Sequence, residues 1–374
     1  MGAIKPATVA VNACSICQLS CPGCFTAELR SRLKGSGLPA YLSASNFGRL
    51  LEGNPWLVSV EFACHGELFL NPELPDILRH AHEKGVLLTA NTGVNLNSVK
   101  PAVLEALVKY RFSSICVALD GTTPESYAAH RVNGNFEAVL DNVRRINALK
   151  REYGSAMPRL FWQFLVFEHN EGELPRARAM ARELGMEFAP SLAFEFVEGR
   201  QVDYYFSSVR DERLVRKELG YASLDEYRRK YGREHMQYAC LMLWDSPLIN
   251  YDGRPWGCCV VGNGLLGDVD FGGNALADGV EKCINGERMQ YARGMLTGAL
   301  PSRNDVPCSD CWLYLERKAN GDWLRRNRLT NELWRLYYAS QAKVPRYHRA
   351  AKVAYQLARR AAARNARRSD VPPG

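Results

Sequence analysis

Short runs rich in β-branched and aromatic residues alternate with longer amphipathic runs through the first half of this chain. Such alternation is typical of repeated βα units, and it predicts a parallel sheet with helices on its outer surface. Several helices begin or end at clear signals, such as Ser43, Gly85 and Gly185. The expected strands are 8–12, 58–63, 86–91, 114–119, 160–167 and 187–189, and the expected helices are 43–53, 73–84, 100–110, 136–151 and 171–184.

Six βα units are too few for a closed eight-stranded barrel, so the sequence predicts an α/β fold with a partial, TIM-like (β/α)6 barrel. Ligands are expected at the carboxyl ends of its strands. We expect the barrel core in residues 1–190, a mostly helical bridge in 191–238, and helices with a basic tail in 316–374. Between them, residues 239–315 contain cysteines and turn signals in place of helix periodicity.

The formal charge of +8 is confined to the C-terminal tail. Residues 343–374 contain nine Lys and Arg and one acidic residue, whereas the rest of the chain has 39 basic and 39 acidic residues. Nucleic-acid binders spread basic residues over a face or groove, so no nucleic-acid partner is expected. A basic amphipathic helix in the tail can contact an anionic membrane or an acidic electron donor, but a solvated helix is the commoner meaning of the pattern.

Twelve cysteines are unusually many for a chain without a use for thiolates. No apolar run is long enough for a membrane helix, and the N-terminus does not resemble a signal peptide, so the cytoplasm is the expected location. Disulfides are rare in that compartment, and metal binding is therefore the expected use of the thiols. Four cysteines lie within residues 14–24, and a second group in the last third comprises Cys240, Cys258, Cys259, Cys308 and Cys311.

The first group follows the first expected strand directly. Three residues separate Cys17 from Cys21, and two separate Cys21 from Cys24. Three soft thiolates suit an iron–sulfur cubane, and because the cubane has four irons, one iron is left open. Adding Cys14 gives a zinc site as the alternative, but zinc sites usually separate their cysteine pairs by a dozen residues or more. The iron–sulfur interpretation is therefore favoured.

This spacing resembles that of the radical S-adenosylmethionine (SAM) enzymes. The resemblance implies that Cys17, Cys21 and Cys24 bind a [4Fe-4S] cluster whose open iron chelates the amino and carboxylate groups of SAM. It also implies that an electron, supplied by a flavodoxin- or ferredoxin-type donor, cleaves SAM. The resulting 5′-deoxyadenosyl radical would then abstract hydrogen from a substrate.

Two further segments resemble family motifs at strand ends. Residues 64–72 read CHGELFLNP and are similar to the Gly-Gly-Glu-Pro motif that contacts the SAM amino group, with His65 at the first glycine. This implies a role for Glu67, for which capping of the next helix is the alternative. Residues 89–93 resemble a Thr-Asn-Gly turn, which implies that Asn91 lies near SAM, although asparagine is also an ordinary turn residue.

A third segment, residues 117–131, resembles the family's Ser-x-Asp-Gly motif and the Tyr and Arg that follow it. Ala118 occupies the serine position, so a hydroxyl contact to the SAM ribose is absent. The resemblance implies that Arg131 holds the SAM carboxylate, because a guanidinium can bind a carboxylate with two hydrogen bonds. A surface ion pair is the alternative role for Arg131.

The second cysteine group resembles the SPASM/twitch domains that carry auxiliary clusters in radical SAM enzymes. An Asp-Gly turn predicts a hairpin over 248–256, which would bring Cys240 and Cys258 together. No cysteine follows Cys311, so the one-cluster twitch form is the better match. The resemblance implies an auxiliary [4Fe-4S] cluster, and a structural zinc is the alternative. The implied ligands are Cys240, Cys258, Cys308 and Cys311.

Three other cysteines have no firm assignment. Cys14 is interpreted as a buried thiol at the end of a strand. Cys259 could replace Cys258 as a ligand. Cys283 is a spare that could be a buried thiol or a donor that quenches a radical.

Four cysteine ligands close an auxiliary cluster to substrate, which suits an electron acceptor. The layout resembles that of radical SAM enzymes like 2-deoxy-scyllo-inosamine dehydrogenase, which oxidise a secondary alcohol of an aminocyclitol. We therefore expect an oxidoreductase with a small polar substrate such as a sugar or aminocyclitol. The first strand begins about seven residues from Met1, whereas some peptide-modifying relatives begin with a leader-binding domain. A peptide or protein maturase or epimerase is the alternative, and a non-catalytic zinc-binding scaffold is the alternative of another class. Unranked candidates for a general base are Glu195, Glu198, Asp203 and Asp245.

Overall fold

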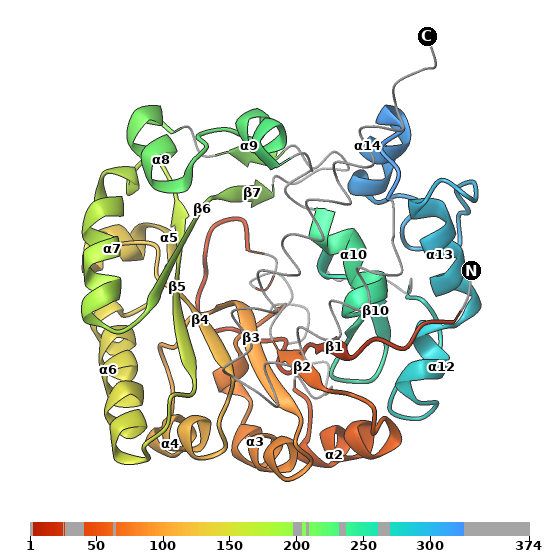
Figure 1. Cartoon of the computed structure of the whole chain (residues 1–374), viewed down its shortest axis with the longest axis horizontal. Coiled ribbons are helices and arrows are strands. Elements are labelled where there is room, and N and C mark those ends of the chain that lie inside the picture. Colours follow the sequence, from red (N-terminus) through yellow and green to blue (C-terminus); the bar gives the residue numbers. More distant parts are fainter. Residues whose placement is uncertain are drawn as a thin grey trace.

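A computed structural model describes residues 3–24, 26, 41–62, 65–196, 204–206, 209–231, 237–260 and 270–324. These residues form an eight-stranded sheet in the order β10-β9-β1-β2-β3-β4-β5-β6 (Figure 1). The six strands that come first along the chain run parallel to one another, which confirms the α/β class and the partial barrel. They are β1 (Thr8–Val11), β2 (Ser59–Phe62), β3 (Leu87–Val94), β4 (Ser114–Ala118), β5 (Arg159–Val166) and β6 (Glu187–Leu192).

Helices cover the outer face of the curved sheet (Figure 1). Alternation along β2 separates the two faces, because successive side chains of a strand point in opposite directions. Val60 and Phe62 are fully buried, and the Phe62 ring lies 5.7 Å from the ring of Phe47. Glu61 lies on the inner face of the barrel. The helices are α2 (Ala44–Gly53), α3 (Leu74–Glu83), α4 (Pro101–Lys109), α5 (Pro124–His130), α6 (Phe136–Glu152) and α7 (Leu174–Glu183), with 3-10 turns η1 (Leu68–Leu70) and η2 (Glu171–Glu173).

Local sequence explains most of these helix ends. Ser43 caps α2 by accepting the Asn46 amide at 3.1 Å, as an N-cap hydroxyl does. The helix expected over 171–184 is instead divided into η2 and α7. Pro175 stands in the first turn of α7, where its missing N–H costs nothing, and it cannot continue a helix from upstream.

The expected helical bridge contains a small sheet as well as helices. β7 (Phe194–Phe196) pairs antiparallel with β8 (Tyr204–Phe206), and the aromatic residues of both strands favour extended backbone. α8 (Glu212–Leu219) and α9 (Leu224–Tyr231) follow. Helices therefore account for part of the bridge, and the domain boundaries themselves stay predictions.

The predicted Asp-Gly hairpin joins the barrel sheet directly. β9 (Leu248–Ile249) and β10 (Pro255–Gly257) are antiparallel, and Gly253 in the turn has φ 90°. β9 also pairs parallel with β1, where Leu248 lies opposite Ala10. The hairpin beside the second cysteine group therefore pairs with β1, the strand that directly precedes the first cysteine group.

A second hydrophobic core packs beside this hairpin. It includes Leu243, Met289, Met295 and Tyr314, all almost completely buried. Helices are more frequent here than the turn signals suggested, because a helix buried on several sides has weak apolar periodicity. They are α10 (Gln237–Asp245), α12 (Val280–Ile284), α13 (Glu287–Leu296) and α14 (Trp312–Asn320).

α14 agrees with the helix expected from residue 313, whereas the basic tail over 343–374 lies outside the described residues. Among the described residues, no helix is both long and apolar enough to cross a membrane.

Candidate functional site

Cys17, Cys21 and Cys24 of the first group lie together on the loop after β1. Burial raises the pKa of the Cys17 thiol to about 12, and the nearby Glu67, Cys24 and Cys21 add to the rise. The loop is tightly turned, because the Cys24 amide donates to the Cys21 carbonyl at 3.1 Å. Cys21 is buried and Cys24 is exposed. Three thiols that lie within electrostatic range of one another are positioned to be ionised by a bound metal centre.

Two N–H groups point at the sulfur of Cys17. The Leu19 amide and the Asn95 side-chain amide each lie 3.4 Å from Cys17 Sγ. Such N–H groups stabilise thiolates and tune iron–sulfur clusters. Sequence reasoning missed Asn95, although its place directly after β3 is one where a parallel barrel puts ligand-binding residues.

Glu67 lies beside this loop and is 2% exposed. Its carboxylate accepts the Asn95 amide at 2.7 Å and the Phe69 amide at 3.2 Å, so it caps η1, not the following helix. Burial raises the pKa of Glu67 to about 7, although these two amides lower it. Glu67 thus ties the loops after β2 and β3 to the cysteine loop.

Gly66 permits this close packing. Its φ is +72°, and a Cβ there would overlap with the Cys14 carbonyl oxygen and lie 2.9 Å from the Ile16 carbonyl oxygen. The Glu67 amide also donates to that Ile16 carbonyl at 2.7 Å. The segment therefore has the glycine that the backbone contact requires, with His65 directly before it.

Arg131 ends α5 and reaches the cysteine loop. Its Nε donates to Asp120 Oδ2 at 2.6 Å, and its Nη1 lies 3.9 Å from Cys21 Sγ. Asp120 is fully buried, and its other oxygen accepts the Leu165 amide at 2.8 Å. This is a partly buried cation fixed beside a thiol, in contrast to the surface ion pair weighed as its alternative role.

Asn91 is exposed and belongs to a different network. Its backbone amide and its side-chain amide donate to Glu61 at 2.5 and 2.9 Å, and its side-chain oxygen accepts the Ser114 hydroxyl at 2.8 Å. The described contacts thus place it with Glu61 on the inner face of the barrel. A role for Asn91 near SAM stays a prediction.

The four predicted cysteines of the second group are brought together by α10, β10 and the start of α14. Burial raises the pKa of Cys308 well above its usual range, and Cys258, Cys311 and Cys240 add to the rise. The Cys311 amide donates to the Cys308 carbonyl at 3.2 Å, which forms a tight turn before α14. The other three thiols therefore lie within electrostatic range of Cys308, and four thiolates are the number of ligands that a closed iron–sulfur cluster takes.

Arg317 of α14 lies beside these thiols and is 3% exposed. Its Nη1 donates to the carbonyl and carboxylate of Asp322 at 3.0 and 2.9 Å. Among the described residues, its buried Nε and Nη2 have no nitrogen or oxygen acceptor, and the guanidinium lies beside the Cys240 thiol. Burial raises the pKa of Cys240, and Arg317 lowers it. These two N–H groups are positioned to donate to the sulfur atoms of a bound iron–sulfur cluster, which would be their hydrogen-bond acceptors.

A buried asparagine links the two regions. Asn12 follows β1 and is fully buried, and its side chain lies 3.1 Å from Asn250 of the hairpin. In the amide orientation that satisfies its neighbours, its nitrogen donates to the His65 and Cys14 carbonyls at 2.9 and 3.2 Å, and its oxygen accepts the Ser15 hydroxyl at 2.8 Å. The Asn12 side chain therefore connects the cysteine loop and the loop after β2 to the hairpin.

The unassigned cysteines occupy distinct positions. The Cys14 thiol is buried and donates to the Ile16 carbonyl at 3.6 Å. Cys283 is buried in the barrel core, where Val280 and Ile284 of α12 also pack. Cys258 interacts with Cys308, whereas the Cys259 backbone contacts His65. Cys64, Glu198 and Asp203 lie outside the described residues, as does the side chain of Glu195; Asp245 ends α10.

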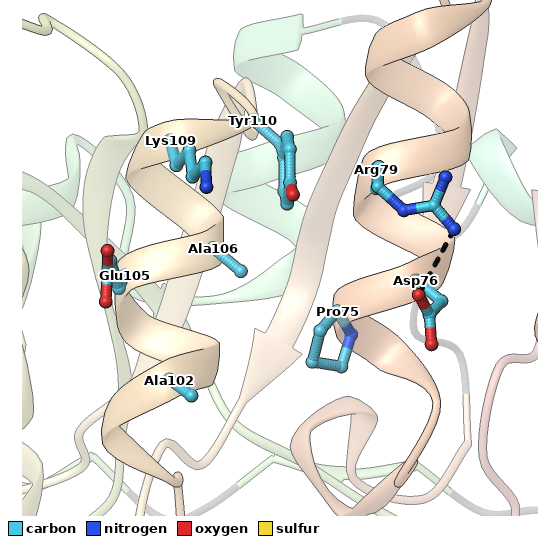
Figure 2. A pocket seen from close by; sticks show the side chains of 8 residues that line it. All are labelled: Pro75, Asp76, Arg79, Ala102, Glu105, Ala106, Lys109 and Tyr110. Carbon is cyan, nitrogen blue, oxygen red and sulfur yellow. Dashed lines mark hydrogen bonds and ion pairs between the residues drawn. The ribbon is translucent and has the colours of Figure 1, made fainter.

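Among the described residues, no three histidine, cysteine or carboxylate side chains are grouped closely enough to hold a single metal ion. A groove of about 220 Å³ lies on the outer surface between α3 and α4, where the side chains of Asp76 and Arg79 pair beside Tyr110 (Figure 2). Both helices pack on the outside of the barrel, so this groove is separate from the cysteine sites.

No protein-family model matches the chain, and no curated protein matches it. Solved structures do. Streptococcus suis SuiB aligns with a TM-score of 0.58 at 12% identity, over 86% of this chain and 76% of SuiB. SuiB bound to precursor peptide SuiA aligns with a TM-score of 0.59 at 13% identity, over 86% and 75%. Native anSMEcpe with bound AdoMet aligns with a TM-score of 0.51 at 14% identity, over 92% and 99%. The chain therefore has the fold of radical SAM enzymes.

Proposed function

We propose that this protein is a radical SAM enzyme. The observation that carries the proposal is the placement of Cys17, Cys21 and Cys24 on one loop at the carboxyl end of β1, with N–H donors aimed at Cys17. These cysteines would hold a [4Fe-4S] cluster. When bound, the cluster and SAM supply reductive cleavage of SAM and a radical that abstracts hydrogen from a substrate.

The residues beside the cysteines are suited to hold SAM. Arg131 is fixed by Asp120 and presents its remaining guanidinium nitrogens towards the loop, where they could bind the SAM carboxylate. Each oxygen of Glu67 accepts one amide and has one further acceptor site, so this carboxylate could also accept the SAM amino group. Both groups are held before SAM arrives, which lowers the entropy cost of ordering them.

The second group would hold an auxiliary [4Fe-4S] cluster. Cys240, Cys258, Cys308 and Cys311 supply four thiolates, and the buried Nε and Nη2 donors of Arg317 could bond to cluster or thiolate sulfur. With no open iron such a cluster suits electron transfer, so we infer that it accepts an electron from the substrate radical. A flavodoxin- or ferredoxin-type protein would supply the first electron.

For the substrate, we favour a small polar molecule such as a sugar or aminocyclitol. Polar groups on the inner face of the barrel, including Glu61, Asn91 and Gln163, support this choice, because a polar substrate needs hydrogen-bonding partners when it is desolvated. A second candidate is a peptide. SuiB has been solved with precursor peptide SuiA, and anSMEcpe with Cp18Cys peptide, so a maturase or epimerase reaction is the alternative.

The test is SAM cleavage by the anaerobically reconstituted protein with dithionite. Wild type should release 5′-deoxyadenosine, and Cys17→Ala should abolish the release because it removes a cluster ligand. Cys14→Ala is the matched control, since the same loop loses a thiol that the proposal does not use. Bound zinc and no SAM cleavage in wild type would instead support the non-catalytic scaffold, and a Cys14→Ala variant that lost zinc would identify the four-cysteine zinc site.

A further inference from the structure

The inner face of the barrel is polar along its middle strands. Thr89 on β3 and Ser114 and Cys116 on β4 lie on this face, because Thr89 is the register partner of Glu61 and Ser114 is the partner of Thr89. Near β1 the same face carries Ala10, which packs with Leu248 and Trp256 of the hairpin, and the buried Thr8 hydroxyl, which lies 2.6 Å from the Ser59 hydroxyl. The polar side chains of β2, β3 and β4 therefore form a polar section of the interior.

Glu61 is the charged group of this section. Its carboxylate accepts the Thr89 hydroxyl, and it accepts two N–H groups from Asn91 at 2.5 and 2.9 Å. All three donors are neutral. In the described part of the chain, the groups that act on the Glu61 carboxylate are these neutral donors, and no lysine, arginine or histidine is among them. A partly buried carboxylate without a counter-charge is costly unless a cation joins it.

A bulge in β3 changes the backbone path in this section of the inner face. The pairing of β3 with β4 shifts between Ala90 and Val94, so the intervening residues leave the regular ladder. Gly93 in the bulge has φ +100°, and a Cβ there would lie 3.3 Å from Gln163 Cδ on β5. The bulge therefore leans across the inner face towards β5 and aims Asn91 at Glu61. Bulges at barrel interiors often re-aim side chains next to ligands.

We propose that the inner face of the barrel at β2 and β3 binds a primary ammonium group of the substrate, with Glu61 as its counter-ion. The inference rests on the proposed function and deepens it by naming a chemical feature of the substrate. Three of the roughly four acceptor sites of a carboxylate are filled, so one is available for an ammonium N–H. The ammonium belongs either to a small amino alcohol or to a lysine side chain.

A purely structural role for Glu61 is the competing explanation. Two amide donors of Asn91 need two acceptor oxygens, and a carboxylate offers them without any ligand. That role predicts a loss of stability when Glu61 is changed, but no preference for cationic over neutral ligands. The two explanations therefore differ in a binding measurement.

Two matched pairs of probes distinguish the sources of the ammonium. The first pair is trans-2-aminocyclohexanol and trans-cyclohexane-1,2-diol, and the second is N-acetyl-lysine amide and N-acetyl-norleucine amide. Calorimetry uses the full chain, reconstituted without oxygen and saturated with SAM. We expect one cationic probe to bind about tenfold or more tightly than its neutral partner, because a charge-assisted hydrogen bond is worth that much.

Three variants complete the experiment. Glu61→Gln should reduce the preference for the cation to less than about twofold, and Glu61→Asp should keep it in part. Glu105→Gln on the outside of α4 is the control and should keep the preference in full. Equal binding of the cationic and neutral probes to wild type, no binding of either cation, or a preference that survives Glu61→Gln would each overturn the proposal.

A pH measurement on wild type covers the case in which the variants do not fold. Burial raises the pKa of Glu61 to about 7, so binding of the cation should tighten about tenfold between pH 6 and pH 8. Among the described residues, Cys116 of β4 is a titratable group that interacts with Glu61, and burial raises the pKa of Cys116 to about 12. Ala10 and Thr89, the register partners of Glu61 on β1 and β3, do not titrate. A flat pH profile would count against Glu61.

Iron content and release of 5′-deoxyadenosine, measured in the same preparation, report on the proposed function separately. A protein that cleaves SAM but shows no cation preference contradicts only this inference. A protein that prefers the cation but binds no iron contradicts only the radical SAM function.

Discussion

Replacing Gly66 with alanine should separate the cysteine loop from the loop after β2. Gly66 has φ +72°, and a side chain in this left-handed region costs about 1–2 kcal/mol. The new Cβ would also overlap with the Cys14 carbonyl oxygen and lie 2.8 Å from its carbon. Those are backbone atoms that cannot rotate away, and overpacking of this kind costs about 1–3 kcal/mol more. We expect Gly66→Ala to lower the free energy of unfolding by about 3 kcal/mol.

Gly85→Ala is the matched control, because Gly85 has nearly the same φ, +68°, and the Cβ that alanine would add there meets no atom within 4 Å. It should lose only the backbone cost of about 1–2 kcal/mol. Urea unfolding followed by circular dichroism gives both values, and iron analysis shows whether Gly66→Ala also weakens cluster retention. Equal losses in the two variants would refute the close contact between Gly66 and Cys14.

Three other changes test single contacts. Burial raises the pKa of Glu67 in the folded protein to about 7, so the folded protein binds the Glu67 carboxyl proton more tightly than the unfolded chain does. The free energy of unfolding should therefore grow by up to about 3 kcal/mol as the pH falls from about 7 towards 4.5. Glu67→Gln should flatten that trend in urea midpoints measured at pH 5.5 and 7.5, and an unchanged slope would contradict it. Asn95→Ala removes an N–H···S bond to Cys17 and should make the potential of the first cluster more negative in an EPR redox titration. Arg317→Met should reduce iron retention after gel filtration, whereas Arg228→Met, which removes an exposed ion pair, should not.

Much of the barrel could be predicted from local sequence. Strands alternate in polarity, and helices end at residues such as Gly85, whose φ is +68°. The cysteine spacing likewise places Cys17, Cys21 and Cys24 on one loop, because residues this close in sequence stay close in space, while their role as cluster ligands stays a prediction. The pairing of β9 with β1 was not predicted, because two residues of strand carry almost no signal of their own.

The parts that sequence reasoning missed are contacts between distant segments. Asn95 meets Cys17 across 78 positions, and Asn12 meets Asn250 across 238. Asparagine is common in loops, so neither residue stands out until the fold places it. Glu61 was missed for a similar reason, since alternation along its strand sets it apart from Val60 and Phe62 but does not show that Asn91 and Thr89 donate to it.

The distribution of iron between the two cysteine groups tests the central claim most directly. Anaerobically reconstituted wild type should contain about eight irons per chain, and a variant with Cys17, Cys21 and Cys24 changed to alanine should keep about four and cleave no SAM. A variant with Cys308 and Cys311 changed to alanine should also keep about four irons, and its first cluster should still bind SAM. Zinc in place of iron, or full iron content in either variant, would contradict the two-cluster account.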